Sequence, residues 1–285
     1  MKRTSHIPEL REMIAQEKSA GRKIALIPTM GYLHRGHLAL VEQAKQTGAF
    51  VVLSIFVNPL QFGPSEDYST YPRDLERDAR LVEEAGVDAL FHPTDQEMYP
   101  HPMVTYVEVG QLDTVLCGAK RPGHFRGVVT VVSKLFHIVQ PDLSFFGQKD
   151  YQQCLIIQRM VSDLNLPIDV CPVPIVREQD GLAISSRNVF LTPEQRQEAS
   201  ILSKSLYEAE LSIRAGVRSA REIERQLREI ITRGSHGIID YVEVRDARDL
   251  SEVTAIESTV IIALAVQFGS TRLIDNKVVG VETFV

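Results

Sequence analysis

Apolar runs alternate with helical patterns up to about Val176, and this alternation limits the fold more than any other feature of the chain. Residues 23–28 (KIALIP), 50–57 (FVVLSIFV) and 88–93 (DALFHP) are short, largely apolar runs. Runs of this kind are typical of strands that are covered on both faces. Because helical segments separate the strands, the sequence predicts a parallel sheet with helices on both sides.

The other elements of this part follow from periodicity and length. Residues 128–140 (VVTVVSKLFHIVQ) fit a strand or a helix, but their length and the PDLSFFG that follows favour a helix leading into a strand. Gly86 is the predicted C-cap of a helix. The predicted helices lie at about residues 7–14, 36–46, 74–86, 128–140 and 150–164, and two more strands lie at 141–147 and 168–176.

The second part of the chain lacks this alternation, since two helices there precede three strands. Thr192 is the predicted N-cap of a helix, with Pro193 at its first position and Gly216 near its end. The predicted helices lie at 192–216 and 219–234, and the strands at 239–247, 259–269 and 277–285. We therefore expect an α/β domain over residues 1–176 and a small α+β domain, acting as a lid, over residues 177–285.

Composition excludes several functions. The 285 residues include 31 basic and 37 acidic side chains, a net charge of −6, whereas nucleic-acid binders usually carry a basic excess. No apolar run reaches the ~18 residues that a membrane span needs. The three cysteines form no CxxC pair, which is typical of free thiols in a reducing compartment. We expect a cytoplasmic protein that binds neither nucleic acid nor a membrane.

The segment PTMGYLHRGH (28–37) joins the first predicted strand to a helix and carries two histidines three positions apart. Ligands of parallel sheets bind at the carboxyl ends of the strands, where this segment lies. His34 and His37 could bind zinc, but a zinc site needs a third protein ligand. They could also be solvated histidines at a helix start. A phosphate-binding site explains more of these residues, because Gly31 and Gly36 would let a bulky anion approach the backbone at a helix N-terminus closely.

Four further segments fit phosphate chemistry or a ligand lid. FFGQKDYQQ (145–153) places Lys149 beside a helix start, where a cation is favourable only if it binds an anion. DGLAISSRN (180–188) can form a mobile loop over a triphosphate. NPLQFGPSEDYSTYPRD (58–74) is too long for a plain connection, which indicates a functional lid. KRPGHFRGV (120–128) gathers Arg121, His124 and Arg126 into a candidate anion pocket.

Taken together, these segments resemble the pantothenate synthetase (pantoate–β-alanine ligase) family over essentially the whole chain. The motifs that carry the resemblance are PTMGYLHRGH, SIFVNPLQF, YPRDLERD, RPGHFRGV, FGQKDYQQ, DGLAISSRN and TRLIDN. The resemblance implies a Rossmann-like nucleotidyltransferase domain that binds ATP and pantoate, a smaller C-terminal domain and a homodimer. It also implies a reaction with ATP and Mg²⁺ in which pantoate is adenylated and β-alanine then attacks, giving pantothenate, AMP and pyrophosphate.

The resemblance also assigns roles to individual residues. His37 is the implied proton donor, with His34 and Lys149 as the other catalytic residues, and Gln61 and Gln153 bind pantoate. The implied ATP-binding residues are Met30, Gly31, Tyr32, Leu33, His34, Arg35, Gly36, His37, Gly147, Gln148, Lys149, Asp150, Val176, Ile184, Ser185, Ser186 and Arg187. Lys149, Ser185 and Arg187 are expected to contact phosphates.

The chain departs from the commoner family pattern at two positions. Gln148 and Cys117 stand where many members have glutamate, which argues against a carboxylate role at either place. The ligands of Mg²⁺ are unknown; Asp78 is a candidate, although a triphosphate could hold the ion alone. Two other functions stay open. The chain could be another HxGH nucleotidyltransferase that acts on a phosphorylated alcohol, or a nucleotide sensor without catalytic activity.

Overall fold

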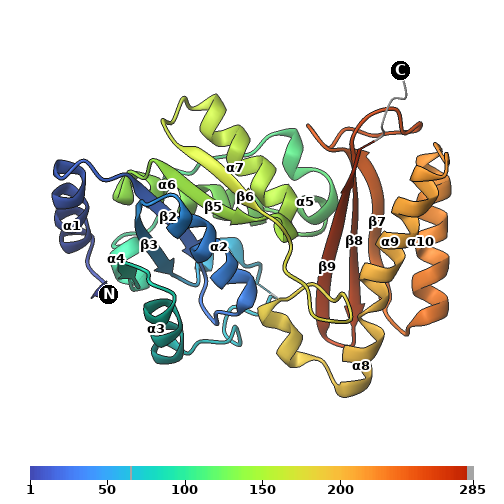
Figure 1. The fold of residues 1–285 in the computed structure, drawn as a ribbon, viewed down its shortest axis with the longest axis horizontal. Helices are drawn as coiled ribbons and strands as arrows, with labels where there is room; N and C mark the ends of the chain where they lie inside the picture. The colour runs from blue at the N-terminus through green and yellow to red at the C-terminus, as the bar shows by residue number, and fades with distance from the viewer. Residues whose placement is uncertain (65, 281–285) are drawn as a thin grey trace. The chain divides into compact units, whose positions relative to one another are not determined.

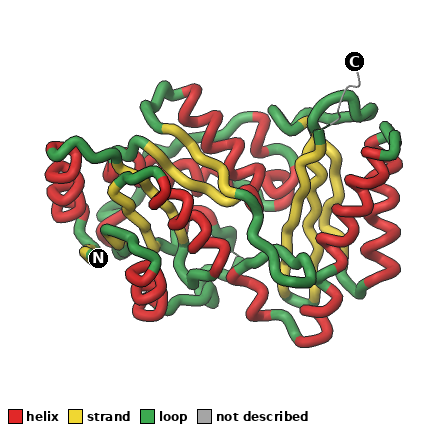
Figure 2. Tube along the Cα trace, viewed as in Figure 1, coloured by secondary structure: helices red, strands yellow, loops and turns green. Residues whose placement is uncertain are grey.

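The computed structural model describes residues 1–64 and 66–280, and the chain forms two compact units. The first unit comprises Met1–Gln148 and Gln152–Pro174. The second comprises Ile175–Val285 together with the short stretch Lys149–Tyr151. Figures 1 and 2 show that each unit consists of a β-sheet with helices packed beside it.

The first unit is built on a six-stranded parallel sheet, which confirms the predicted fold class. The strand order is β1-β4-β3-β2-β5-β6. The strands are β1 (Lys2–Thr4), β2 (Ile24–Thr29), β3 (Phe50–Ile55), β4 (Ala89–Phe91), β5 (Leu143–Gly147) and β6 (Asp169–Val173). After β2 the chain first adds strands on one side and later on the other. The carboxyl end of β2 is therefore the topological switch point, where doubly wound sheets bind ligands.

Helices cover both faces of β2. Ala25 and Ile27 belong to one buried cluster with side chains of α2 (Arg35–Gln46) and α3 (Leu75–Glu84). Ile24 and Leu26 point to the opposite face and are fully buried there. On that side α1 (Ile7–Ser19) and α6 (His124–Val139) contact both β2 and each other. The other helices of the unit are α4 (Asp95–Met98), α5 (Leu116–Lys120) and α7 (Tyr151–Asp163).

One strand of this sheet was not predicted. β1 consists of only Lys2, Arg3 and Thr4 and has no apolar run, and it is recognisable only by its parallel pairing with β4. The strand that was predicted as the first, β2, is therefore the second in the chain. Its position at the centre of the sheet does not change, so the predicted location of the HxGH segment at a strand end is confirmed.

The second unit has helices followed by an antiparallel sheet of order β7-β8-β9, as the predicted α+β class requires. Its buried cluster joins the sheet to α9 and α10, which Figure 1 shows side by side. The helices are α8 (Pro193–Glu198), α9 (Ile201–Arg214) and α10 (Ala220–Gly234), and the strands are β7 (Ile238–Asp246), β8 (Val260–Phe268) and β9 (Thr271–Val279).

Two predictions for this unit were wrong in detail. The helix expected over 192–216 is interrupted after Glu198, where the hydroxyl of Ser200 donates to the carbonyl of Gln197 and the backbone tightens to three-residue hydrogen bonds. The last strand was expected over 277–285, but it begins at Thr271, because Gly269 at φ +60° allows a tight turn directly after β8. Residues 281–285 lie outside the described part of the chain.

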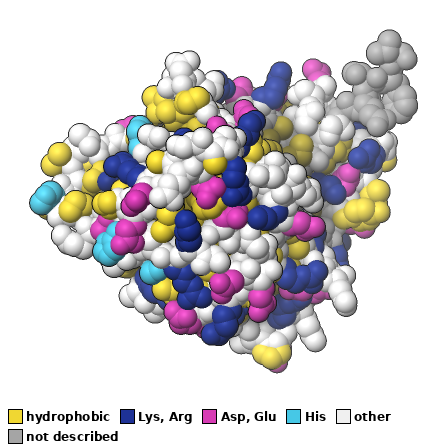
Figure 3. Space-filling view, turned by 60° about the vertical axis from the view of Figure 1, so that its left-hand side comes forward, with side chains coloured by type: hydrophobic (Ala, Val, Ile, Leu, Met, Phe, Trp, Pro, Cys, Tyr) yellow, Lys and Arg dark blue, Asp and Glu magenta, His cyan; other side chains and the backbone are white. Residues whose placement is uncertain are grey.

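The surface carries mixed charge on the face drawn in Figure 3, where basic and acidic side chains are interspersed. Within residues 1–64 and 66–280, none of the helices is both long and apolar enough to cross a membrane.

Candidate functional site

The loop after β2 adopts a left-handed backbone at two consecutive residues. Gly31 has φ +83° and Tyr32 has φ +50°. A Cβ at position 31 would lie 2.9 Å from Ile55 Cγ2 and 3.2 Å from a carboxylate oxygen of Asp78, so glycine is required by both conformation and space. Thr29 fixes the start of the loop, since its hydroxyl donates to the carbonyl of Ser54 at 2.7 Å.

Asp78 holds the end of the same loop. Its Oδ1 accepts a hydrogen bond from the backbone N–H of Leu33 at 2.8 Å, and Arg77 donates to the carbonyl of Leu33 at 2.9 Å. Burial raises the pKa of Asp78, although the backbone N–H groups of Leu33 and Tyr32 and the charge of Arg77 lower it. Its second oxygen, Oδ2, is buried and has no hydrogen-bond partner among the described residues. Helix α3 therefore fixes the backbone that precedes His34.

His34 and His37 form a reciprocal cap at the start of α2. The Nδ1 atom of His34 accepts from the backbone N–H of Gly36 at 3.2 Å, and the Nδ1 atom of His37 accepts from the N–H of His34 at 3.3 Å. Their ring centroids are 4.0 Å apart. A neutral imidazole that accepts at Nδ1 carries its proton on Nε2, and such an N–H can donate to a phosphate oxygen.

Gly36 has a role that the sequence did not reveal. A Cβ at this position would lie 3.0 Å from two atoms of the His34 ring. The glycine therefore lets the imidazole lie over the first turn of the helix. The reciprocal cap, the two imidazole rings and the backbone N–H groups together make the N-terminus of α2 a favourable place for an anion to bind.

Gln61 lies in a buried amide cluster after β3. It ends the 3₁₀ helix η1 (Pro59–Gln61) and is 8% exposed. The Asn58 amide donates to Gln61 Oε1 at 3.1 Å, while Gln61 Nε2 donates to the sulfur of Met30 at 3.2 Å. The structure thus brings the predicted pantoate residue Gln61 into contact with the predicted ATP residue Met30.

Asn58 is a residue that the sequence analysis missed. It is 1% exposed, donates to the carbonyl of Gly127 and accepts from the hydroxyl of Tyr99 at 2.7 Å. A signal was available, because an asparagine directly before Pro59 at a strand end is typical of a helix or turn cap. Its burial depends on residues far along the chain, and therefore could not be predicted.

The basic segment 120–128 divides into two parts. Arg121 forms an ion pair with Glu66 and contacts His124, whose Nδ1 is 2.9 Å from the carbonyl of Gln61. Although burial opposes ionisation, the hydrogen bonds and charge of Arg121 keep the pKa of Glu66 below its usual value. Arg126 lies apart, beside Glu108 and 4.3 Å from the Tyr106 ring centroid. Arg121 and His124 thus support the Gln61 turn.

The two neighbouring glutamines of α7 have different surroundings. Gln152 is buried, accepts from the backbone N–H of Cys117 at 2.9 Å and donates to the carbonyls of Leu112 and Val115. It therefore stabilises the loop before α5. Gln153 is half-buried. Cys117 is buried, so a glutamate at its position would need a buried partner.

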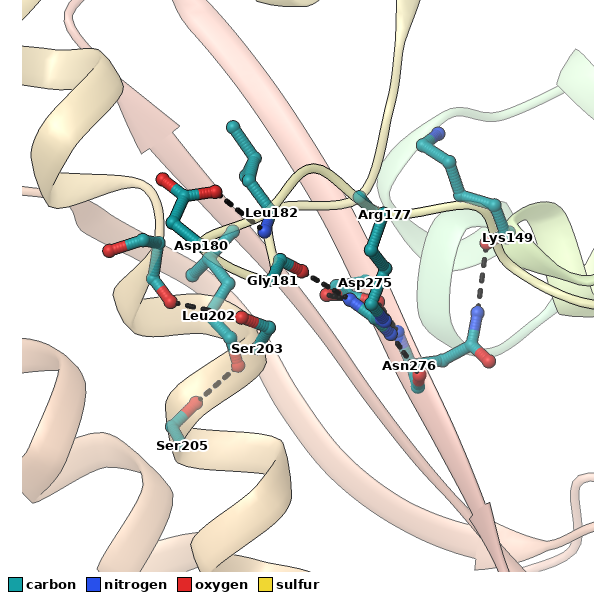
Figure 4. Close-up of polar contacts among 12 residues, drawn as sticks. Lys149, Arg177, Asp180, Gly181, Leu182, Leu202, Ser203, Ser205, Asp275 and Asn276 are labelled. Atoms are coloured by element: carbon teal, nitrogen blue, oxygen red, sulfur yellow. Dashed lines mark hydrogen bonds and ion pairs between the residues drawn. The ribbon is translucent and has the colours of Figure 1, made fainter. Parts of the chain in front are cut away.

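In the second unit, Lys149 lies in the 3₁₀ turn η3 (Gln148–Asp150) rather than in α7 itself. Its amine is 3.8 Å from a carboxylate oxygen of Asp150, and its side chain is 20% exposed. Figure 4 shows this side chain extending away from the Lys149 carbonyl, which accepts a hydrogen bond from Asn276 at 2.9 Å.

The segment predicted as a loop over a triphosphate is a hairpin followed by a 3₁₀ helix. Ile184 donates to the carbonyl of Val176 at 3.0 Å, closing the hairpin. Ser185 then caps η4 (Ser186–Phe190), because its hydroxyl accepts from the backbone N–H of Arg187 at 3.2 Å. The second unit thus collects Lys149, Asp150, Val176 and Ile184–Arg187, while the first holds Met30–His37, Gln61, Gly147 and Gln153.

Clusters suited to a metal ion are absent from the described ranges, 1–64 and 66–280, where no three His, Cys, Asp or Glu side chains are grouped for this purpose. Mg²⁺ that arrives with a nucleotide needs only one or two carboxylates in addition to the phosphates. Asp78, the candidate ligand, lies next to the HxGH loop, but its Oδ2 oxygen is buried.

Comparison with known proteins gives a consistent result. The family model for pantoate–β-alanine ligase matches residues 2–278. A pantothenate synthetase of Desulfitobacterium hafniense is 64% identical over 272 residues, which are 95% of this chain and 96% of the relative. The crystal structure of pantothenate synthetase from Thermus thermophilus superposes with a TM-score of 0.92 at 47% identity, covering 97% of this chain and 99% of that one.

A second solved structure is the pantoate–β-alanine ligase from Francisella tularensis, complexed with beta-gamma ATP and β-alanine. It is 32% identical and has a TM-score of 0.80, with 97% of each chain covered. Both solved structures match this chain in sequence and in fold along nearly its whole length. The chain therefore belongs to the pantoate–β-alanine ligase family.

Proposed function

We propose that this chain joins pantoate to β-alanine through a pantoyl adenylate, consuming ATP and releasing pyrophosphate and AMP. The observation that carries the proposal is the capped His34–His37 helix start, located at the switch point of the sheet in a member of this family. Such a helix start favours anions through its backbone N–H groups and its dipole.

The first step forms the adenylate. A carboxylate oxygen of pantoate attacks the α-phosphorus of ATP, the bond from that phosphorus to the bridging oxygen breaks, and pyrophosphate leaves. Negative charge increases on the oxygens around phosphorus in the transition state. Donors fixed in advance, here the Nε2–H groups of His34 and His37 and the amine of Lys149, stabilise that charge without reorganisation.

The second step forms the amide. The amine of β-alanine attacks the acyl carbon, the bond from that carbon to the AMP oxygen breaks, and the amine loses a proton. AMP is a better leaving group than the oxide of a free carboxylate. A site with little water protects the adenylate from hydrolysis in the meantime.

The residue roles that we propose follow the sequence analysis. Gln61 and Gln153 bind the hydroxyl and carboxylate groups of pantoate, since amides both donate and accept hydrogen bonds. The residues proposed for ATP are Met30–His37, Gly147–Asp150, Val176 and Ile184–Arg187. We also propose that Mg²⁺ enters with ATP and that the enzyme is a cytoplasmic homodimer, as the family resemblance implies; sedimentation measurements would test the dimer.

Gln61→Ala is expected to weaken pantoate binding about tenfold or more, because one hydrogen bond to a charged ligand contributes about 1.5–3 kcal/mol. ATP binding should change less than twofold. Calorimetric titration of each ligand measures both effects, and Gln111→Ala, an exposed glutamine of the same unit, is the control. An equal loss for both ligands, or a loss for ATP alone, would show that Gln61 is misassigned.

The order of the chemistry tests the proposed function itself. Adenylation needs no amine, so the enzyme should exchange labelled pyrophosphate into ATP when pantoate is present and β-alanine is absent. The complete reaction should give AMP. ADP as the product would point to an acyl phosphate and would refute the adenylate. ATP binding without turnover would instead favour the nucleotide sensor.

A further inference from the structure

Strand β9 contains two adjacent buried polar residues whose carboxylate and amide groups have no obvious place in a hydrophobic core. Asp275 is 2% exposed and Asn276 is 5% exposed, and both belong to the TRLIDN motif. An ionised carboxylate is buried only when it is paired and hydrogen-bonded, because removing it from water is costly. The partners of these two side chains therefore show what the motif does.

Asp275 is held by a two-pronged ion pair with Arg177. The guanidinium nitrogens Nη1 and Nη2 lie 2.6 Å and 2.9 Å from the two carboxylate oxygens. The same Nη1 donates to the carbonyl of Gly181 at 3.0 Å, at the tip of the hairpin (Figure 4). One guanidinium therefore joins β9 to both ends of the hairpin segment 177–181.

The hairpin itself is held by its own backbone and by α9. The N–H of Glu178 donates to the carbonyl of Leu182 at 2.8 Å, and the N–H of Gly181 donates to the carbonyl of Glu178 at 3.0 Å. Gly181 has φ +92°, and a Cβ there would lie 2.5 Å from the hydroxyl of Ser203 on α9. The backbone that leads to Ser185 is thus fixed from two sides.

Asn276 connects a second segment to the same strand. Its side-chain amide donates to the carbonyl of Lys149 at 2.9 Å, while its backbone N–H donates to Asp275 Oδ1 at 2.7 Å. Tyr151 adds a further anchor, because its hydroxyl donates to the carbonyl of Ala247 at 2.7 Å. The turn that carries Lys149 is therefore tied to the sheet of the second unit.

We propose that Asp275 and Asn276 are positioning residues for ATP. From adjacent places on one strand they fix the hairpin that leads to Ser185–Arg187 and the turn that carries Lys149, so that both segments meet one triphosphate. This inference rests on the proposed function for the ATP assignment. A buried ion pair often adds little net stability, and its benefit here is the relative position of two phosphate-binding segments.

Calorimetric titration with ATP and with AMP tests the proposal without requiring turnover. Asp275→Asn removes one of the two bonds to Arg177, and Asn276→Ala leaves the Lys149 carbonyl without this amide. Each variant should displace one phosphate-binding segment, so that the triphosphate loses about one charged hydrogen bond and ATP binds about tenfold more weakly. AMP binding should weaken much less. The KM for ATP should rise, while the KM for pantoate stays within about twofold.

Asp240→Asn is the matched control, since Asp240 lies on β7, outside both ATP segments, and pairs at 2.8 Å with Arg272, which shares β9 with Asp275. It should leave ATP binding unchanged. Equal losses for ATP and AMP, or the same loss in the control, would overturn the proposal. If Asp275→Asn does not fold, Asn276→Ala decides the question alone. Failure of the wild-type enzyme to form pantothenate would refute the proposed function and leave the binding test valid.

Discussion

Replacing His37 with alanine is expected to lower the turnover number about 10²- to 10³-fold, the loss typical of one transition-state donor. The Nδ1 atom of His37 accepts from the N–H of His34, which directs its Nε2 proton away from the helix backbone. Steady-state rates with saturating ATP, pantoate and β-alanine measure the effect. A rate within threefold of the parent would remove His37 from the mechanism.

The cap requires a control, because His37→Ala also removes a helix-capping contact that contributes about 1 kcal/mol. Glutamate or glutamine is the usual residue at position N3 of a capping box, which His37 occupies here. His37→Gln should therefore restore the thermal stability that is lost with alanine. We expect it to leave the turnover low. Recovery of turnover along with stability would mean that His37 acts mainly as a cap.

Gly127→Ala is expected to destabilise the protein by about 1–3 kcal/mol and to weaken pantoate binding strongly. A Cβ on this residue of α6 would lie 2.3 Å from the carbonyl oxygen of Leu60 and 2.6 Å from Gln61 Cα. Because both contacts are to backbone, the Asn58–Gln61 turn must move and carry Gln61 with it. Denaturant unfolding and pantoate titration measure the two effects.

Gly63→Ala provides the comparison, since a Cβ there would meet only the Glu66 side chain at an ordinary 3.6 Å. Gly63 follows the Asn58–Gln61 turn closely in the chain. The substitution Gly63→Ala should leave both stability and pantoate binding near the parent values. If Gly127→Ala also leaves pantoate binding unchanged, the turn does not hold Gln61 for the substrate.

The sheet could be predicted because its strands are continuous apolar runs, such as residues 50–57, and because the helices between them have clear periodicity. The strand β1 could not, since Lys2–Thr4 carries no hydrophobic signal and exists only through its pairing with β4. The break after Glu198 was hidden for a similar reason: it depends on how Ser200 uses its hydroxyl, and the residue type alone does not decide that.

Some features of the candidate site could likewise be predicted from the sequence, and others could not. Strand ends, glycines and helix starts pointed to His34, His37 and Lys149. The reciprocal cap was beyond prediction, because it depends on the orientation of two rings. Asn58 and Asp275 were missed because each is defined by partners distant in sequence: Tyr99 for the first, and Arg177 for the second. The burial of such polar residues has no local signature in the sequence.

The long sequence separation between strand β9 and the segments that it holds affects how the chain folds during synthesis. Arg177 precedes Asp275 by 98 residues, and Lys149 precedes Asn276 by 127. At roughly 5–20 residues per second, a ribosome needs about 5–25 s to supply these partners. The parallel sheet, complete at Val173, has that interval in which to fold. A nascent chain can therefore fasten the two segments proposed for ATP only after β9 has been made, well after the last strand of the parallel sheet.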